Sequence, residues 1–238
     1  MSKGQDRKKE ARKKPQKSLK EKRAEKRAKR DGGGWSPSGG PGHMPTTPGL
    51  ILASTSVYRR ELLSRLKVPF AVRKPAVDEA SQAGEAPRDR AERLALAKAE
   101  AIALEEPAKV VIGADQVAVC EGLILDKPGH AEAARSQLRR QSGRSVQFYS
   151  AVAVVHATRG LRDCFVDLTT VVFRELSAAE IDAYLAADQP YDCAGSLRSE
   201  ALGLSLCERI DTQDPTGLIG LPLIRLAASL RSCGYALP

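Results

Sequence analysis

The stretch LILASTSVYRREL, residues 50–62, contains the transition that decides the fold. Its first four residues, 50–53, predict a buried strand, three hydroxyl residues follow, and 57–66 predicts a helix. A helix that starts directly after a strand presents unpaired N–H groups, which bind anions. Arg59 and Arg60 lie in the first turn of this helix, where the helix dipole favours negative charge. A bound phosphate would make the arginines favourable there, and an ordinary N-cap with solvated arginines explains the pattern equally well.

Beyond this stretch, apolar patterns predict strands that alternate with helices. Residues 110–119 are too apolar for a half-exposed strand, and 146–157 and 163–173 flank a short turn as an antiparallel pair. Ser177 and Glu180 form a capping box at the start of a helix. Helices are predicted at 87–105, 130–141, 177–185 and 221–233. Alternating elements that include a hairpin predict an α/β fold with a mixed sheet.

The positive charge of the chain is concentrated at its N-terminus. Residues 1–30 contain fifteen Lys or Arg and four Asp or Glu, whereas residues 31–238 carry a net charge of −2. Residues 32–49 are rich in Gly, Pro and Ser, so we expect a basic tail and linker over 1–48 and one folded domain over 49–238. Lys/Arg runs neutralise phosphates, which leaves open a weak contact between this tail and nucleic acid; the simpler interpretation is a solvated extension.

Cysteine usage and hydropathy narrow the class of protein. The five cysteines are odd in number and form no CxxC pair, which favours a reducing compartment over a disulfide framework or a zinc ribbon. No apolar segment follows the N-terminal charges, so we expect no secretory signal. Since no run of about 18 apolar residues exists, we expect no membrane span and a cytoplasmic location.

Carboxylates in unusual surroundings indicate a candidate site. Asp115 lies within the apolar segment 110–119 and close to Gly113, and a carboxylate there is costly unless it is paired, metal-bound or beside a cleft. Asp78 and Glu79 add two carboxylates after an extended segment, with a surface turn as the alternative. Carboxylates near phosphate-binding groups imply a hard cation such as Mg²⁺.

Two lysines and two serines complete the candidate set. Lys98 falls in the middle of the apolar stripe of the helix predicted at 87–105, so it either reaches solvent or places a charge in a pocket above the sheet. Lys127 lies in a turn held by a proline. Ser54 and Ser56 can cap the first helix or donate hydrogen bonds to a phosphate.

In this order, these residues resemble the motifs of the Maf family of nucleoside triphosphate pyrophosphatases. The resemblance covers essentially all of 49–238 and none of 1–48. The matching motifs are Ser54-x-Ser56-x-x-Arg59, Val77-Asp78-Glu79, Leu94-Ala95-x-x-Lys98-Ala99, Gly113-Ala114-Asp115, Lys127-Pro128, Ala194-Gly195-Ser196 and Ile219-Gly220-Leu221-Pro222. It implies a mixed twisted sheet flanked by helices, with a cleft between two lobes as in inosine triphosphatases, often as a homodimer.

The resemblance also implies a reaction and a role for each residue. The reaction is hydrolysis of a nucleoside triphosphate to the monophosphate and pyrophosphate. Asp115 is implied as the general base, and Glu79 and Asp115 are implied as ligands of a divalent cation, Mg²⁺ or Mn²⁺. The residues implied to bind the phosphates are Ser54, Ser56, Arg59, Lys98 and Lys127.

Three departures from the common thymidine and uridine triphosphate branch of the family concern the substrate. Tyr58, Gln116 and Glu200 stand where that branch has Arg, Thr and Gln, and they are similar to the branch that prefers 7-methyl-GTP. The match is incomplete, because that branch usually has Pro and Trp where this chain has Val57 and Tyr58. Glu200 can accept both donors on the Watson–Crick edge of guanine, and the face of Tyr58 can attract a cationic methylated base. The alternatives are that Tyr58 fills the core and that Glu200 is a partner in a surface ion pair.

The expected substrate is therefore 7-methyl-GTP, with removal of non-standard nucleotides as the expected purpose. Hydrolysis of dTTP, UTP or another modified nucleotide is the alternative. A nucleic-acid-associated protein that acts through its basic tail is the alternative of a different class.

Overall fold

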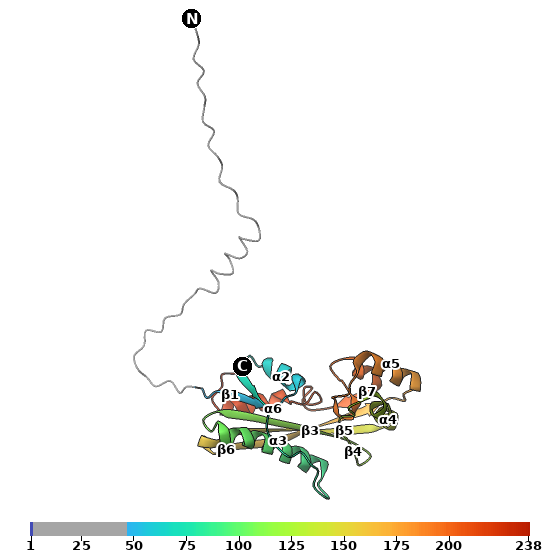
Figure 1. Cartoon of the computed structure of the whole chain (residues 1–238), viewed down its shortest axis with the longest axis horizontal. Coiled ribbons are helices and arrows are strands. Elements are labelled where there is room, and N and C mark those ends of the chain that lie inside the picture. Colours follow the sequence, from blue (N-terminus) through green and yellow to red (C-terminus); the bar gives the residue numbers. More distant parts are fainter. Residues whose placement is uncertain (2–46) are drawn as a thin grey trace, which may run out of the picture. The chain divides into compact units, whose positions relative to one another are not determined.

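Seven strands form one mixed sheet, and helices lie on both of its faces (Figure 1). The computed structural model describes Met1 and residues 47–238, so the expected basic tail and its contact with nucleic acid fall outside the described residues. The strands are β1 (Leu50–Ala53), β2 (Phe70–Arg73), β3 (Val110–Cys120), β4 (Leu123–Leu125), β5 (Ser145–His156), β6 (Leu161–Phe173) and β7 (Cys207–Asp211).

The strand order is β2-β1-β3-β5-β6-β7, with β4 beside β3. β1 pairs in parallel with β2 and β3, and the other pairs are antiparallel. The predicted α/β fold with a mixed sheet and a long β5–β6 hairpin is therefore confirmed. The short strands β2, β4 and β7 are not predicted from the sequence. β1 is equally short, and the polar turn and the helix that follow it identify it.

The helices are α2 (Val57–Ser64), α3 (Pro87–Glu105), α4 (Ala131–Gln141), α5 (Ala178–Asp188) and α6 (Leu223–Ser232), with short 3-10 segments at Ala157–Arg159, Ala194–Ser196 and Leu202–Leu206. All five predicted helices are present, and α3 has the predicted bounds. α2 ends two residues earlier than predicted, and α5 continues three residues further. The capping box of Ser177 and Glu180 is formed as predicted.

The buried side chains form three clusters, of which one lies on one face of the sheet and two lie on the other. α3 covers one face, where its alanines pack on β3 and β5. The opposite face carries two clusters, one beneath α2 and α6 and the other beneath α4 and α5 at the far end of the sheet (Figure 1). These two clusters form the cores of the two lobes that the resemblance implies.

β3 runs through both lobes, and one of its edges is open between them. β1 pairs with β3 as far as Gly113, and β4 begins to pair at Ala118. Within the described part of the chain, residues 114–117 therefore have no neighbouring strand on that side. Asp115 and Gln116 lie in this gap, beyond the carboxyl end of β1, where open α/β sheets place their ligands.

The close packing of α3 on β3 depends on Gly113. A Cβ atom at this position would lie 2.1 Å from the carbonyl oxygen of Ala95 and 2.6 Å from the backbone nitrogen of Ala99. The element that approaches the backbone of Gly113 this closely is α3. This packing places Lys98 against Asp115.

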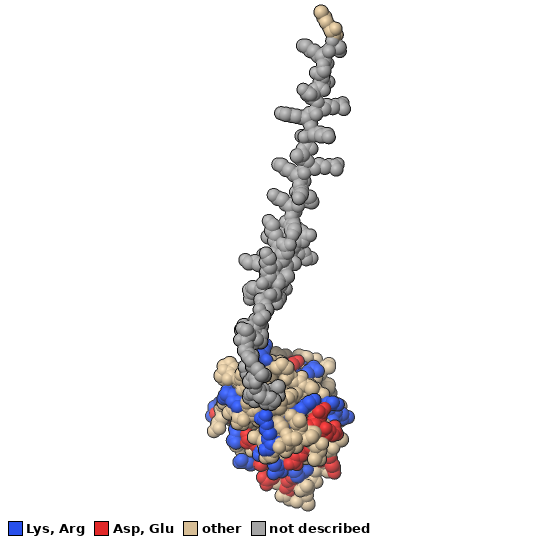
Figure 2. Space-filling view, turned by 90° about the vertical axis from the view of Figure 1, so that its left-hand side faces the viewer, with Lys and Arg blue, Asp and Glu red and all other residues tan. Residues whose placement is uncertain are grey.

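The surface carries both signs of charge without a large patch of either on the face shown in Figure 2. This distribution agrees with the small net charge of residues 31–238. All five cysteines are free. Among the described residues, no helix combines the length and the apolar character needed to cross a membrane.

Candidate active site

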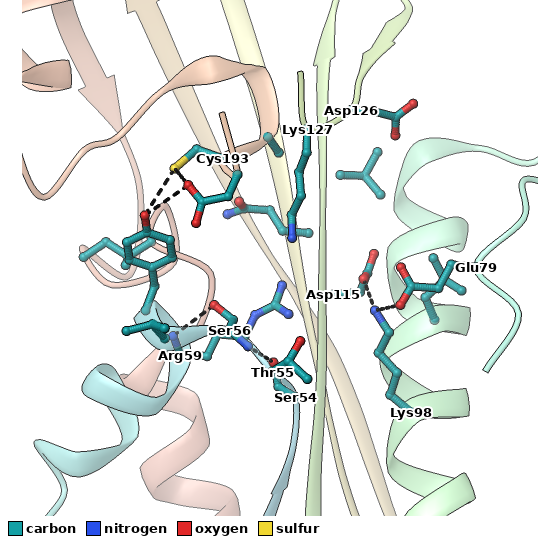
Figure 3. A pocket seen from close by; sticks show the side chains of 18 of the residues that line it. Ser54, Thr55, Ser56, Arg59, Glu79, Lys98, Asp115, Asp126, Lys127 and Cys193 are labelled. Carbon is teal, nitrogen blue, oxygen red and sulfur yellow. Dashed lines mark hydrogen bonds and ion pairs between the residues drawn. The ribbon is translucent and has the colours of Figure 1, made fainter. Parts of the chain in front are cut away.

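A pocket of about 540 Å³ opens between the two lobes (Figure 3), and its size suits a small-molecule ligand. All ten predicted site residues line it: Ser54, Ser56, Tyr58, Arg59, Glu79, Lys98, Asp115, Gln116, Lys127 and Glu200. The structure thus brings the predicted residues together, and their individual roles stay predictions.

The turn between β1 and α2 is held by its own serines. The Oγ atom of Ser54 accepts a hydrogen bond from the N–H of Ser56 at 3.2 Å. The Oγ atom of Ser56 caps α2 by accepting from the N–H of Arg59 at 3.4 Å. The capping role considered for Ser56 is therefore real, and it orients the start of α2 toward the pocket.

The two arginines of α2 lie in different surroundings. Arg60 is exposed, whereas the side chain of Arg59 turns into the pocket, where Nε donates to the carbonyl oxygen of Gly220 at 3.0 Å. Burial lowers the pKa of Arg59, and the negative charges of Asp115 and Glu79 oppose that effect. These two carboxylates supply the negative charge that makes Arg59 favourable at the start of the helix.

Lys98 joins the two carboxylates. Its Nζ atom lies 2.7 Å from Oδ1 of Asp115 and 2.8 Å from Oε1 of Glu79 (Figure 3). Lys98 and Asp115 are buried and Glu79 is exposed, so Lys98 places its charge in the pocket and does not reach solvent. Burial would raise the pKa of Glu79, but its hydrogen bond and ion pair with Lys98 and the charges of Lys127 and Arg59 together lower it.

The adjacent acids Asp78 and Glu79 have different environments. Oδ1 of Asp78 accepts a hydrogen bond from the N–H of Ala80 at 2.9 Å. The surface turn considered for both acids is therefore correct for Asp78. Glu79 instead reaches across to Lys98, so only this acid joins the site.

Lys127 reaches the pocket from the opposite wall. The loop that carries it is anchored to α4, because Nε2 of Gln137 donates to the carbonyl oxygen of Asp126 at 2.8 Å. Figure 3 shows the Lys127 side chain pointing into the space between Arg59 and Asp115. A phosphate group in that space would be within reach of positive charge from both lobes.

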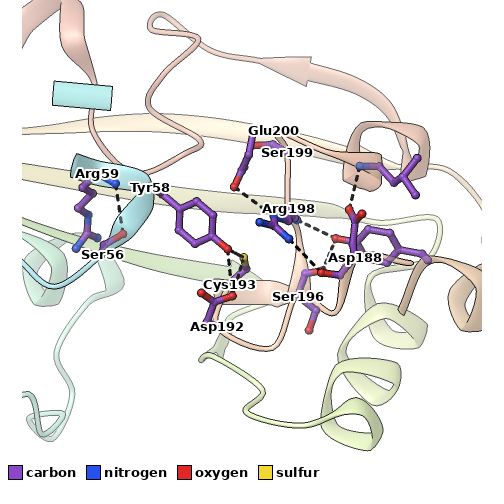
Figure 4. A network of polar contacts seen from close by, with 12 residues as sticks. Ser56, Tyr58, Arg59, Asp188, Asp192, Cys193, Ser196, Arg198, Ser199 and Glu200 are labelled. Atoms are coloured by element: carbon purple, nitrogen blue, oxygen red, sulfur yellow. Dashed lines mark hydrogen bonds and ion pairs between the residues drawn. The ribbon is translucent and has the colours of Figure 1, made fainter. Parts of the chain in front are cut away.

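Tyr58 and Glu200 lie at the other end of the pocket, in one network with Arg198 (Figure 4). The hydroxyl group of Tyr58 donates to Oδ1 of Asp192 at 3.2 Å. The guanidinium carbon of Arg198 lies 5.6 Å from the centroid of the Tyr58 ring, and its Nε lies 3.7 Å from Oε1 of Glu200. Arg198 therefore contacts one face of Tyr58 and pairs with the acid expected to read guanine.

Cys193 is part of this network, and its surroundings disfavour the thiolate form. Burial is the main cause that raises the pKa of its thiol to about 12, and the charge of Asp192 adds to the effect. The side chain is therefore a neutral thiol at physiological pH. It contributes packing beside Tyr58.

Three residues at the site are not predicted from the sequence. Arg90 lines the pocket from α3, eight residues before Lys98 and therefore on the same helix face, so helical spacing from Lys98 would have found it. Its Nη2 atom lies 3.6 Å from Oδ1 of Asp126. Asp192 and Arg198 carry no local signal, because they meet Tyr58 only through the fold.

Glu79 and Asp115 fit a divalent cation that is shared with a substrate. Their oxygens converge on the Nζ atom of Lys98. In the described part of the chain, no three His, Cys, Asp or Glu side chains form a metal-binding group. Mg²⁺ is usually held by one or two carboxylates together with substrate phosphates, so two converging carboxylates in a phosphate pocket are a suitable donor set.

Known proteins resemble this chain over most of its length. Residues 49–233 match the family described as Maf-like protein. The chain is 54% identical over 193 residues to a 7-methyl-GTP pyrophosphatase of Polaromonas sp., with 81% of this chain and 88% of that protein covered. It is 54% identical over 193 residues to a 7-methyl-GTP pyrophosphatase of Bordetella pertussis, with 80% and 96% covered. It is 52% identical over 191 residues to one of Xanthomonas oryzae pv. oryzae, with 80% and 100% covered. The chain therefore belongs to the Maf family, as its motifs predict.

Proposed function

We propose that the protein hydrolyses 7-methyl-GTP to 7-methyl-GMP and pyrophosphate, and so removes a non-standard nucleotide. One observation carries this proposal: Lys98, Asp115 and Glu79 share a pocket with the Ser54–Ser56 turn and Arg59. A helix N-terminus that suits phosphate and a carboxylate that suits water activation then meet in one space. The activity agrees with the names of the relatives described above.

The charges of the pocket support a substrate that arrives with a cation. Its positive side chains are Arg59, Lys74, Arg90, Lys98 and Lys127, and its negative side chains are Glu79, Asp115, Asp126, Asp192 and Glu200. These charges balance, so a triphosphate adds negative charge that is not neutralised. A divalent cation held by Glu79 and Asp115 would neutralise part of it, and it would polarise the phosphate and acidify bound water.

We infer that Asp115 acts on the attacking water. Its carboxylate accepts a proton from water as the water oxygen bonds to the α-phosphorus. The bond between the α-phosphorus and the bridging oxygen breaks, and pyrophosphate leaves. Arg59, Lys98 and Lys127 stabilise the charge that develops on the departing group.

The base end of the pocket suits a cationic guanine. Glu200 is exposed and its ion pair with Arg198 is long, at 3.7 Å, so exchanging this partner for base N–H groups costs little. The anionic Glu200 and the ring of Tyr58 both favour the positive charge that N7 methylation creates.

We expect Glu200→Gln to reduce the preference for 7-methyl-GTP over dTTP by about tenfold, because glutamine has one acceptor atom and no charge. The measurement is the ratio of kcat/KM values for the two nucleotides. Glu208→Gln is the matched control, since Glu208 is an exposed acid on β7 that does not line the pocket. An unchanged ratio in Glu200→Gln would show that Glu200 does not read the base.

We also expect excess EDTA to abolish pyrophosphate release, and Mg²⁺ or Mn²⁺ to restore it. Glu79→Gln should raise the metal concentration needed for half-maximal rate, because it removes one of the two carboxylates. Nucleotide-dependent binding of Mn²⁺, followed by electron paramagnetic resonance, provides a readout that is independent of turnover. Full activity in EDTA would exclude the proposed cation.

The experiment that tests the proposed function is a substrate panel. 7-Methyl-GTP, GTP, dTTP and UTP are compared at equal concentration, with pyrophosphate as the measured product. The proposal requires the highest kcat/KM for 7-methyl-GTP. A higher value for dTTP or UTP would establish the alternative substrate class, and no pyrophosphate from any of them would reject the activity.

A further inference from the structure

The side-chain amide of Gln116 is surrounded by acceptors on one side. Its Nε2 atom donates to Oγ of Ser150 at 2.8 Å, to the carbonyl oxygen of Leu218 at 2.9 Å and to that of Gly217 at 3.3 Å. Gln116 lines the pocket at the open edge of β3. No residue that the structure describes donates a hydrogen bond to its Oε1 atom.

Ser150 and two backbone carbonyl groups together determine which end of this amide faces inward. The hydroxyl group of Ser150 donates its own proton to the carbonyl oxygen of Gly217 at 2.7 Å, so it offers Gln116 only a lone pair. If the amide were turned over, its oxygen would face the carbonyl oxygens of Gly217 and Leu218, and Ser150 could donate to it only by giving up its own hydrogen bond to Gly217. The NH₂ group therefore points inward and the oxygen points toward the pocket.

The arrangement is built into rigid parts of the fold. Gln116 and Ser150 are directly opposite in the register of β3 and β5, between the cores of the two lobes, and Ser150 is fully buried. The loop that supplies the two carbonyl groups is closed by a hydrogen bond from the Gly217 N–H to the Asp214 carbonyl at 2.9 Å. Neither β5, which carries Ser150, nor the loop that supplies the two carbonyl groups can therefore rearrange to bind a turned amide.

We propose that Ser150 is a positioning residue for base selection, which holds Gln116 so that its Oε1 atom accepts a hydrogen bond from the substrate base. This inference rests on the proposed function. Guanine carries donors at N1 and N2, so Glu200 and a fixed Gln116 oxygen can each accept from one of them, whereas adenine carries an acceptor at N1, which both oxygens repel. A site that leaves a polar group unpaired rejects the wrong base strongly.

Ser150→Ala removes one of the three acceptors around the amide and leaves the carbonyl oxygens of Gly217 and Leu218, so the hold on the Gln116 amide is weakened. We expect the ratio of kcat/KM for GTP to that for ATP to fall by about three- to tenfold, the effect of one neutral hydrogen bond. The change should arise mainly in KM, with kcat for GTP retained, because Ser150 does not touch the phosphates. Ser229→Ala is the matched control, since Ser229 is also a buried serine with a side-chain hydrogen bond, but it lies on α6 away from the pocket.

A double-mutant cycle separates positioning from a general structural effect. If Ser150 acts through Gln116, then Ser150→Ala leaves the GTP-to-ATP ratio unchanged in a Gln116→Ala background. A ratio that is unchanged in the single variant, or that falls equally in both backgrounds, would overturn the inference. Hydrolysis of 7-methyl-GTP by the unmodified protein is measured alongside. If that hydrolysis is absent, the proposed function has failed; if it is present, only the role of Ser150 is in question.

Discussion

We expect Asp115→Asn to lower kcat for 7-methyl-GTP by a factor of about 10²–10⁴, the usual contribution of a general base. Asparagine keeps the shape of the side chain and an oxygen that can accept from Lys98, so the fold and the pocket should be retained. It cannot take a proton from water, and it is a weaker ligand for a divalent cation. The dissociation constant for nucleotide should change by no more than about threefold, since the phosphate-binding cations are untouched.

Binding and turnover are measured separately for this variant. Isothermal titration gives the dissociation constant for 7-methyl-GTP, and single-turnover release of pyrophosphate gives the rate. Asp126→Asn is the control, because Asp126 is a highly exposed acid at the rim of the same pocket and points away from Asp115 in Figure 3. A rate above about a tenth of the unmodified value in Asp115→Asn would show that another group activates the water.

The second large effect is expected for Lys98→Met. This change removes the cation that lies between Asp115 and Glu79 and takes one charge from the phosphate site. Loss of such a stabilising group costs about 10²–10³ in kcat. Because Asp115 then stays buried without its partner, the free energy of unfolding should also fall by roughly 3 kcal/mol.

The pH dependence of the rate in Lys98→Met should shift in a defined direction. In the unmodified protein, burial raises the pKa of Glu79, and Lys98 provides the largest of the opposing effects that lower it. Without Lys98 the pKa of Glu79 rises, so the carboxylate becomes protonated at a higher pH. The acid limb of the pH–rate profile should therefore move to higher pH, and the stability contributed by this ionised carboxylate should be lost earlier as the pH falls.

Two further variants test whether the losses of rate and stability in Lys98→Met arise from its contacts with Glu79 and Asp115. Lys109→Met removes a half-exposed lysine that pairs with Glu106 outside the pocket, and it should change neither the rate nor the acid limb. The Lys98→Met, Asp115→Asn double variant should recover part of the lost stability, because the buried charge is gone. An acid limb that stays in place in Lys98→Met would contradict the proposed coupling of Lys98 to Glu79.

The sequence predicts the elements that have strong local patterns. The transition at 50–62 predicts β1, the hydroxyl turn and α2, and the apolar run at 110–119 predicts β3 with Asp115 inside it. For Lys98, the apolar helix stripe leaves two outcomes open, solvent or a pocket above the sheet, and the structure shows the pocket. Order along the chain then identified the family, since several weak motifs in the right sequence are specific together.

The contacts between distant segments could not be predicted in the same way. Nothing local to Glu79 shows that it reaches Lys98 while Asp78 holds a surface turn. The contact of Arg198 with the ring of Tyr58 depends on a loop that precedes β7. The hydrogen bonds around the amide of Gln116 depend on the register of β3 with β5 and on a loop that follows β7. Such features arise from tertiary packing, for which one sequence carries no periodic signal.

The site of water attack is the central chemical claim, and isotope labelling tests it most directly. Hydrolysis of 7-methyl-GTP is carried out in water enriched in ¹⁸O, and both products are analysed by mass spectrometry. Attack at the α-phosphorus places one ¹⁸O atom in 7-methyl-GMP and none in pyrophosphate, which is the result we expect. Label in the pyrophosphate, or in released inorganic phosphate with 7-methyl-GDP as the other product, would contradict the arrangement of Asp115 and the phosphate-binding cations described above.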